Sequence, residues 1–166
     1  MAHRGQSRGS VFQPTVDAIV TLAAFVATVA AGLFAGAAVY VTAVEHPARI
    51  ERGPAFAVEQ FGPSYRRGAV MQGGLAVLGL LAGIVAWYQR SGIGWLVGGL
   101  VLGALVPFTL LVIMPTNRRL LDPALDRGSP EARKLLSRWG RLHAVRTIVG
   151  VVVFVAFVAM CMRGSP

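Results

Sequence analysis

Charged residues are absent from four long stretches of the chain, and this pattern predicts its main elements. The uncharged stretches are Ala18–Val44, Gly68–Gln89, Ser91–Asn117 and Thr147–Met162, of 27, 22, 27 and 16 residues. A helix needs roughly 20 predominantly apolar residues to cross the hydrocarbon core of a bilayer. The pattern therefore predicts an all-α, polytopic membrane protein: an antiparallel bundle of four transmembrane helices.

One domain over residues 15–163 is expected to contain all four spans, after a polar N-terminal tail over 1–14. The spans are predicted at about 16–45, 67–89, 92–115 and 141–162. Arg4 and Arg8 precede the first span as they would precede a secretory signal. The apolar part of a signal peptide has about 7–15 residues, however, so we expect this longer run to be retained as a span.

The fourth uncharged stretch is too short to span a bilayer alone, so its helix is expected to begin earlier. Sixteen residues rise about 24 Å, against a hydrocarbon core of about 30 Å. Ser129-Pro130 supplies an N-cap serine followed by proline at the first helical position, which predicts a helix start near residue 130. That helix would carry Trp139, His143 and Arg146 on one face.

The connection between the first two spans is predicted to contain a short interfacial helix. Within Gly53–Tyr65, Phe56, Val58 and Phe61 lie among polar residues, a pattern typical of amphipathic segments at the membrane surface. In the third span, Pro107 is expected to kink the helix.

Composition and charge agree with a membrane protein. Only 14% of the residues are charged, against about a quarter in soluble domains. The single cysteine, Cys161, excludes a disulfide scaffold. The net charge of +9 is expected to meet lipid phosphates, because the basic residues flank the spans and no nucleic-acid-binding signature accompanies them.

The basic residues are distributed unequally between the two predicted membrane faces. Twelve of the sixteen lie in the loops Glu45–Arg67 and Arg118–Arg146, which share one face. The positive-inside rule places this charge-rich face in the cytoplasm and both termini outside the cell membrane.

Polar and aromatic side chains gather where the spans meet the charge-rich face. The candidate catalytic residues are His46, Asn117, His143 and Arg146, and the candidate substrate contacts are Tyr40, Glu45, Tyr65, Gln72 and Trp139. Each has a simpler explanation alone: an interfacial histidine, a helix cap, a snorkelling arginine or an aromatic anchor. Together they indicate a site, because ionisable groups inside membranes are costly and usually face the bundle interior.

Two kinds of chemistry fit this set. The imidazoles of His46 and His143 are ligands that suit a transition metal, although two histidines rarely complete a site. Alternatively, one imidazole is a general base, and Asn117 and Arg146 stabilise an oxyanion such as a phenolate. The spans contain no chain of carboxylates, which argues against a proton-driven transporter.

Three motifs in this order resemble the anthrone-oxygenase-like family of small four-helix membrane proteins. They are Gly32-Leu33-Phe34-Ala35-Gly36 with Val44-Glu45-His46-Pro47-Ala48-Arg49, then Met114-Pro115-Thr116-Asn117-Arg118-Arg119-Leu120, then Trp139-Gly140-Arg141-Leu142-His143-Ala144-Val145-Arg146-Thr147. The resemblance covers roughly residues 16–162.

The resemblance implies an oxidoreductase of monooxygenase type that needs no added cofactor. Characterised family members oxidise anthrones to anthraquinones with dioxygen. By this likeness, His46 or His143 would deprotonate a hydrophobic aromatic substrate, Asn117 and Arg146 would hold its anion, and Tyr40 and Trp139 would contact its rings. The alternatives are a metal- or haem-binding membrane protein that uses His46 and His143, and a non-enzymatic scaffold that contacts only lipids.

Overall fold

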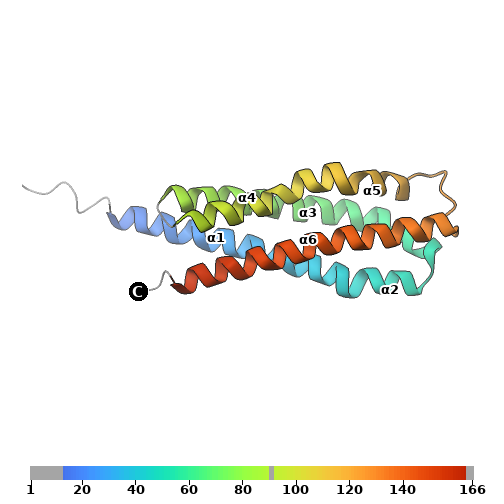
Figure 1. Ribbon diagram of the computed structural model, residues 1–166, viewed down its shortest axis with the longest axis horizontal. Coiled ribbons are helices and arrows are strands. Elements are labelled where there is room, and N and C mark those ends of the chain that lie inside the picture. Colours follow the sequence, from blue (N-terminus) through green and yellow to red (C-terminus); the bar gives the residue numbers. More distant parts are fainter. Residues whose placement is uncertain (1–12, 90–91, 164–166) are drawn as a thin grey trace, which may run out of the picture.

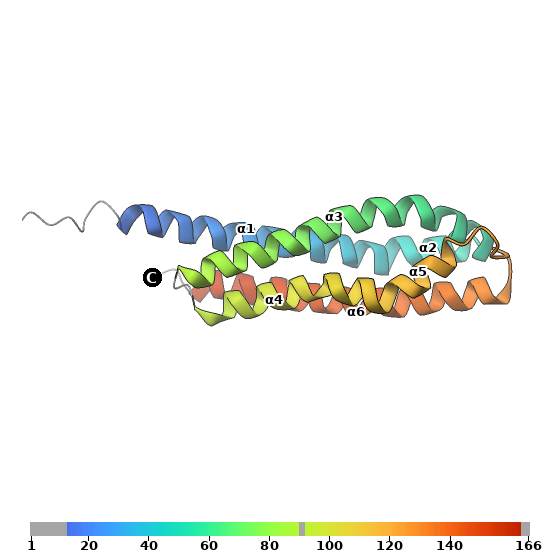
Figure 2. The ribbon, with the colours of Figure 1, turned by 90° about the horizontal axis from the view of Figure 1, so that it is seen from above.

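The chain folds into four long helical rods that lie side by side (Figures 1 and 2). The computed structural model describes residues 13–89 and 92–163, and within these ranges all secondary structure is helical. Each of the four rods contains a helix that is long and apolar enough to cross a membrane. The predicted four-span, all-α membrane fold is thus confirmed, and most of the predicted polar tail over 1–14 lies outside the described residues.

The rods differ in how regular they are. The first consists of α1 (Gln13–Tyr40), a π-helical segment η1 (Val41–Glu45) and α2 (His46–Glu51). The second is the single helix α3 (Pro54–Tyr88), and the third consists of α4 (Ile93–Phe108), the π-helical segment η2 (Thr109–Ile113) and α5 (Met114–Leu120). The fourth is α6 (Pro130–Arg163), which begins at the proline of the Ser129-Pro130 pair.

The prediction of a separate interfacial helix over Gly53–Tyr65 is wrong. Gly53, at a φ of 91°, ends the turn after α2, and α3 then runs without a break from Pro54. The apolar side chains of Val58 and Phe61 are buried in a cluster with residues of α5 and α6. The amphipathic face therefore packs against other rods of the bundle, which buries it better than a position on the lipid headgroups.

Each π-helical segment ends two residues before a proline. The N–H of His46 bonds to the Val41 carbonyl, and the N–H of Met114 bonds to the Thr109 carbonyl, so both bonds span five residues. Pro47 and Pro115 come next in the chain, and a proline in a regular α-helix clashes with the carbonyl four residues earlier. The wider turn lets both rods continue past their prolines. The irregularity of the third rod thus starts at Thr109, two residues after Pro107.

Glycines bring the rods close together at the end away from the charges. A Cβ on Gly83 of α3 would lie 2.6 Å from the Trp95 carbonyl oxygen of α4, and one on Gly98 would lie 2.3 Å from the Phe157 ring of α6. Small residues permit this approach where no hydrophobic force drives helices together. This half of the bundle is filled by side chains, mostly alanine, leucine and phenylalanine.

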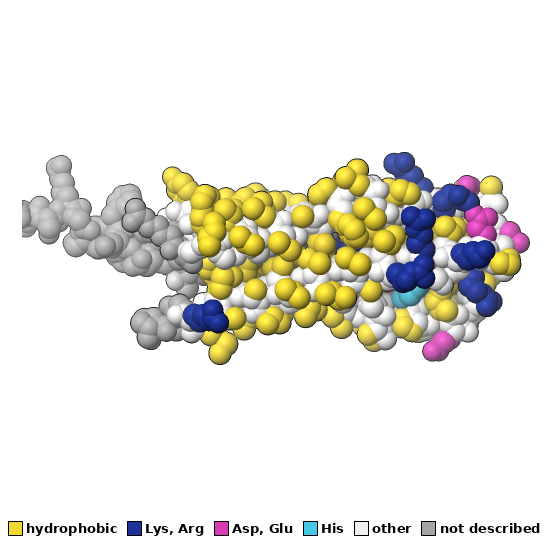
Figure 3. Space-filling view, viewed as in Figure 1, with side chains coloured by type: hydrophobic (Ala, Val, Ile, Leu, Met, Phe, Trp, Pro, Cys, Tyr) yellow, Lys and Arg dark blue, Asp and Glu magenta, His cyan; other side chains and the backbone are white. Residues whose placement is uncertain are grey.

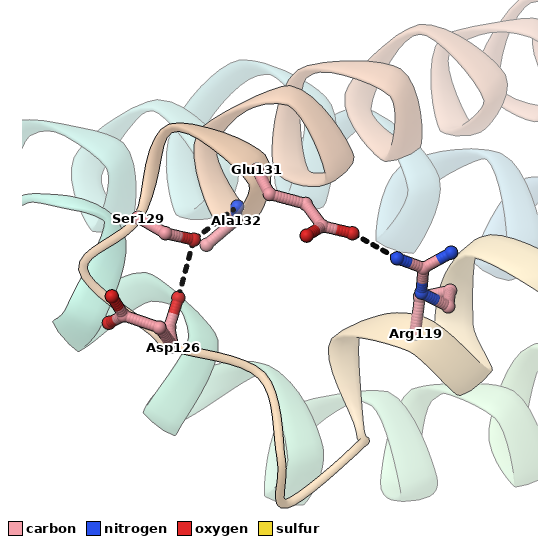
Figure 4. Close-up of polar contacts among 5 residues, drawn as sticks. All are labelled: Arg119, Asp126, Ser129, Glu131 and Ala132. Atoms are coloured by element: carbon pink, nitrogen blue, oxygen red, sulfur yellow. Dashed lines mark hydrogen bonds and ion pairs between the residues drawn. The ribbon is translucent and has the colours of Figure 1, made fainter.

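Most charged side chains cover the opposite end, where they form a band of basic and acidic groups (Figure 3). The loop 121–129 lies there and is fixed by local contacts (Figure 4). Ser129 Oγ accepts a hydrogen bond of 3.2 Å from the Ala132 N–H and donates one of 2.6 Å to the Asp126 carbonyl. Arg119 forms an ion pair with Glu131, which links α5 to α6.

Candidate functional site

A cavity of about 530 Å³, here called the main cavity, lies between the rods at the charge-rich end. It brings together eight of the nine residues predicted as site residues: Tyr40, Glu45, Tyr65, Gln72, Asn117, Trp139, His143 and Arg146. His46 does not line it. All four rods contribute residues, so the cavity forms only when the bundle is assembled.

His143 of α6 is buried and is held by a chain of hydroxyl groups. Its Nδ1 lies 3.0 Å from Thr42 Oγ1, which lies 2.8 Å from Thr147 Oγ1. Thr147 Oγ1 is in turn 3.2 Å from the carbonyl oxygen of Ala38 and from that of His143 itself. The two threonines come from facing rods, so this chain joins α6 to the first rod.

The direction of this chain assigns the histidine tautomer. A carbonyl oxygen only accepts, so Thr147 donates to it, and Thr42 then donates to Thr147. Thr42 has no second proton, so His143 Nδ1 must donate to Thr42. In a neutral imidazole this arrangement leaves Nε2 of His143 as an unprotonated acceptor.

His46 lies behind the cavity wall. Its ring packs against the Trp139 indole, with centroids 5.1 Å apart, and Trp139 also stacks on His143 at 4.8 Å. Gly140 makes room for His46, because a Cβ at Gly140 would lie 2.6 Å from His46 Nε2. The geometry therefore gives His46 a position that supports Trp139.

Three residues of the main-cavity lining present buried polar atoms that have no hydrogen-bond partner among the described residues, as do His46 and Thr116 outside the lining. Asn117 is fully buried, and neither its Oδ1 nor its Nδ2 is paired. Arg49, 3% exposed, forms an ion pair with Glu45, but its Nε and Nη1 are unpaired. Arg146 donates from Nη2 to Gln72 Oε1 at 2.7 Å and leaves Nε unpaired. Buried polar groups are nearly always paired, so this concentration beside a cavity indicates a site for a polar ligand group.

Arg49 was not among the predicted site residues. Arg49 in the first rod and Asn117 in the third rod occupy equivalent positions. Each lies two residues after the proline that follows a π-helical segment. Both side chains are buried and line the main cavity. The sequence did contain a signal for Arg49: it lies four residues after Glu45, which places both side chains on one helix face.

Aromatic rings form one wall of the main cavity. Phe61 meets Trp139 edge to face at 5.3 Å and stacks on Tyr65 at 5.5 Å. The Tyr65 hydroxyl donates to Met114 Sδ at 3.5 Å. The cavity thus combines a flat, apolar wall with polar groups, which suits a planar aromatic ligand that carries oxygen.

The main cavity opens between α1 and α3. The exposed lining residues are Tyr40 of α1, 57% exposed, and four residues of α3: Gln60, Pro63, Arg67 and Met71. The buried members lie on the inner faces of the rods.

The charge of the cavity favours an anion. Arg49, Arg67 and Arg146 are the cations among its lining residues, and Glu45 is the carboxylate. In a low-dielectric environment an uncompensated guanidinium attracts negative charge more strongly than in water. No group of three or more His, Cys, Asp and Glu side chains that could hold a metal ion occurs among the described residues.

The fold and the site define the class of this protein: it is a four-helix membrane bundle with a cavity lined by aromatic rings and arginines. The family model for anthrone oxygenase matches residues 61–156, more than half of the chain. The chain belongs to the anthrone oxygenase family.

Two curated relatives carry the same name. The chain is 37% identical to anthrone oxygenase tpcL of Aspergillus fumigatus over 100 residues, 55% of this chain and 62% of the relative. It is 27% identical to an anthrone oxygenase of Claviceps purpurea over 153 residues, 83% of this chain and 84% of the relative. The first match thus spans less than two thirds of the relative's length. No solved structure matches this chain.

Proposed function

We propose that this protein is a membrane oxygenase that converts a hydrophobic, anthrone-like aromatic to the corresponding quinone with dioxygen. One observation carries the proposal: His143 lines the same cavity as Asn117 and Arg146, whose Nδ2 and Nε donors are unpaired. Its volume of about 530 Å³ lies within the range of pockets that enclose small organic ligands. The names of the two relatives support the substrate class.

His143 Nε2 is the general base in this proposal. It removes a proton from the methylene group between the two outer rings, and the resulting charge spreads onto the oxygen of the carbonyl group opposite that carbon. Asn117 Nδ2 and the Arg146 guanidinium hold that oxyanion. Trp139 and Tyr65 contact the rings and exclude water.

The carbanion carbon then adds to dioxygen, and the peroxide takes up the proton from His143. Loss of the second C–H proton breaks the O–O bond. The carbon becomes a ketone with one oxygen atom, and the other oxygen atom leaves with both hydrogens as water. Oxygen is the oxidant throughout, so the residues supply only proton transfer, charge stabilisation and orientation.

The proposal also includes the orientation in the membrane. The charge-rich end, with the main cavity, faces the cytoplasm of the cell, and both termini lie outside. The substrate enters from the bilayer between α1 and α3.

The test measures oxygen uptake and quinone formation with dithranol, a dihydroxylated anthrone, by the purified protein in lipid nanodiscs. We expect His143→Ala to lower kcat by about 100-fold or more, because general base catalysis contributes at least that factor. Val145→Ala is the matched control, since Val145 is an exposed α6 residue outside the cavity lining. Metal analysis of the same samples tests the metal-binding alternative.

Equal rates for wild type and His143→Ala, after subtraction of spontaneous oxidation, would contradict the proposed base. A stoichiometric metal that is lost in both His46→Ala and His143→Ala would favour the metal-binding protein instead.

A further inference from the structure

A second, smaller cavity lies beside the main cavity, towards the middle of the rods. Its volume is about 140 Å³. Most of its lining is apolar and comes from α1, α3 and the third rod: Phe34, Ala69, Gly73, Ala76, Leu105, Val106, Leu110 and Met114, with Tyr65, Gln72, Thr109 and Arg146 as the polar members. We call it the small cavity.

The two cavities share a wall. Tyr65, Ala69, Gln72 and Arg146 line both. The hydrogen bond from Arg146 to Gln72 therefore lies at the boundary, and the Arg146 guanidinium also lies over the Phe34 ring, 5.4 Å from its centroid. Whatever occupies the small cavity is thus next to the arginine that holds the oxyanion in the proposed reaction.

The size of the small cavity restricts its occupant. An engineered apolar cavity of about 150 Å³ in another protein stays dry and binds benzene or xenon. A volume of about 140 Å³ is therefore too small for three fused rings but sufficient for a small apolar molecule. The main cavity is the one that accommodates the aromatic substrate.

The small cavity opens on a different side of α3 from the main cavity. Leu110 of η2 is 56% exposed, and Gly73 of α3 is half-buried. Their exposed surfaces belong to predominantly apolar spans, so the opening faces the hydrocarbon of the bilayer. Dioxygen is apolar and dissolves better in hydrocarbon than in water.

We propose that the small cavity takes up dioxygen from the bilayer and delivers it to the substrate past Arg146. This inference rests on the proposed function. The two reactants then arrive by separate openings: the aromatic between α1 and α3, and dioxygen between α3 and η2. Arg146 lines both cavities, so it lies on the path between them.

Two neighbouring glycines of α3 provide a matched test. A Cβ at either Gly73 or Gly74 would meet no atom within 4 Å, so neither position is closed to a side chain at its first atom. Only Gly73 lines the small cavity. We expect Gly73→Leu to raise the KM for dioxygen several-fold with dithranol at saturation, while the KM for dithranol stays at the wild-type value. Gly74→Leu should leave both constants unchanged.

Xenon provides a readout that does not depend on catalysis. Xenon NMR of the protein in nanodiscs should show a bound, exchanging population in wild type and Gly74→Leu that is lost in Gly73→Leu. Xenon should also inhibit turnover in competition with dioxygen.

Three results would overturn the inference. The first is an unchanged KM for dioxygen in Gly73→Leu, the second is no bound xenon in wild type, and the third is a raised KM for dithranol alone, which would assign the cavity to the aromatic or a lipid chain. These outcomes leave the proposed function intact, whereas absence of dithranol turnover in wild type would contradict the proposed function itself.

Discussion

At the scale of single residues, the site depends on the hydroxyl chain that fixes His143. Thr42 and Thr147 are ordinary residues of membrane helices, and neither was predicted as part of the site. Thr147 lies four residues after His143 on the same helix face, whereas Thr42 comes from the first rod. The sequence indicates which side chains share a helix face, but not which residue of another rod they meet.

The hydroxyl of Thr42 is therefore expected to act as a positioning group for His143. Thr42→Val keeps the shape of the side chain and removes the acceptor for Nδ1–H, so the imidazole loses its preference for the tautomer with a free Nε2. We expect kcat to fall by about tenfold, equivalent to about 1.4 kcal/mol in the activation free energy, with little change in KM.

Nitrogen NMR of labelled histidine should show a mixture of tautomers in Thr42→Val, and Thr42→Ser should restore both the tautomer and the rate. A Thr42→Val protein with wild-type kcat and an unmixed tautomer would show that the chain has no part in the reaction.

Gly140 should tolerate no side chain as long as His46 is present. A Cβ 2.6 Å from His46 Nε2 forces the imidazole, and with it Trp139, out of place. We expect Gly140→Ala to lower the thermal unfolding temperature and the turnover of dithranol, although alanine favours a helix by about 1 kcal/mol over glycine.

The double variant separates the clash from other effects of alanine. In a His46→Ala protein the clash is gone, so adding Gly140→Ala should then leave the unfolding temperature unchanged or raise it. If Gly140→Ala is equally destabilising in both backgrounds, His46 does not occupy the space above Gly140.

At the scale of elements, the uncharged runs were sufficient to predict four spanning helices, and Ser129-Pro130 to predict the start of α6. The interfacial helix was predicted wrongly because an amphipathic face on lipid headgroups and one against α5 and α6 have the same sequence pattern. The π-helical segments were not foreseen, since Pro47 suggested only the end of a helix. The structure shows that an inserted wide turn lets the rod continue and turns Arg49 and Asn117 inward.

Replacement of Pro115 is expected to lower turnover without lowering thermal stability. Pro115→Ala restores a backbone N–H and permits regular α-helix through Thr109–Ile113, which would rotate Asn117 relative to the cavity. Thermal stability should be unchanged or higher, since proline is the poorest helix former, whereas dithranol turnover should fall several-fold. Unchanged turnover in Pro115→Ala would mean that the π-helical turn does not position Asn117.

At the scale of the whole molecule, the main cavity and most of the charged side chains occupy the same end. The glycine-rich half packs rods closely and carries few charges, while the other half holds both loops, the charged band and the main cavity (Figure 3). The sequence was sufficient to predict this asymmetry. Eight of the nine residues predicted as site residues line the main cavity, and they were chosen from their positions near helix ends. The sequence could not predict that His46 lies behind the wall, since the direction of a side chain directly after a π-helical segment depends on the local helix winding.

The length of α6 has a further consequence. Its 34 residues extend about 51 Å at 1.5 Å per residue, against a hydrocarbon core of about 30 Å. Because the uncharged part begins only after Arg146, we expect the main cavity to lie near the boundary between the hydrocarbon core and the aqueous phase. In the proposed reaction, the aromatic and dioxygen would then arrive from the hydrocarbon, and the water that is formed would leave to the aqueous phase.

Such a reaction at a phase boundary should depend on membrane thickness. In vesicles of phosphatidylcholines with increasingly long acyl chains, hydrophobic mismatch would draw the cavity into the hydrocarbon and slow the loss of water and protons. We expect dithranol turnover per enzyme to pass through a maximum and then decline as the chains lengthen. A rate that is independent of chain length would place the site wholly on one side of the boundary.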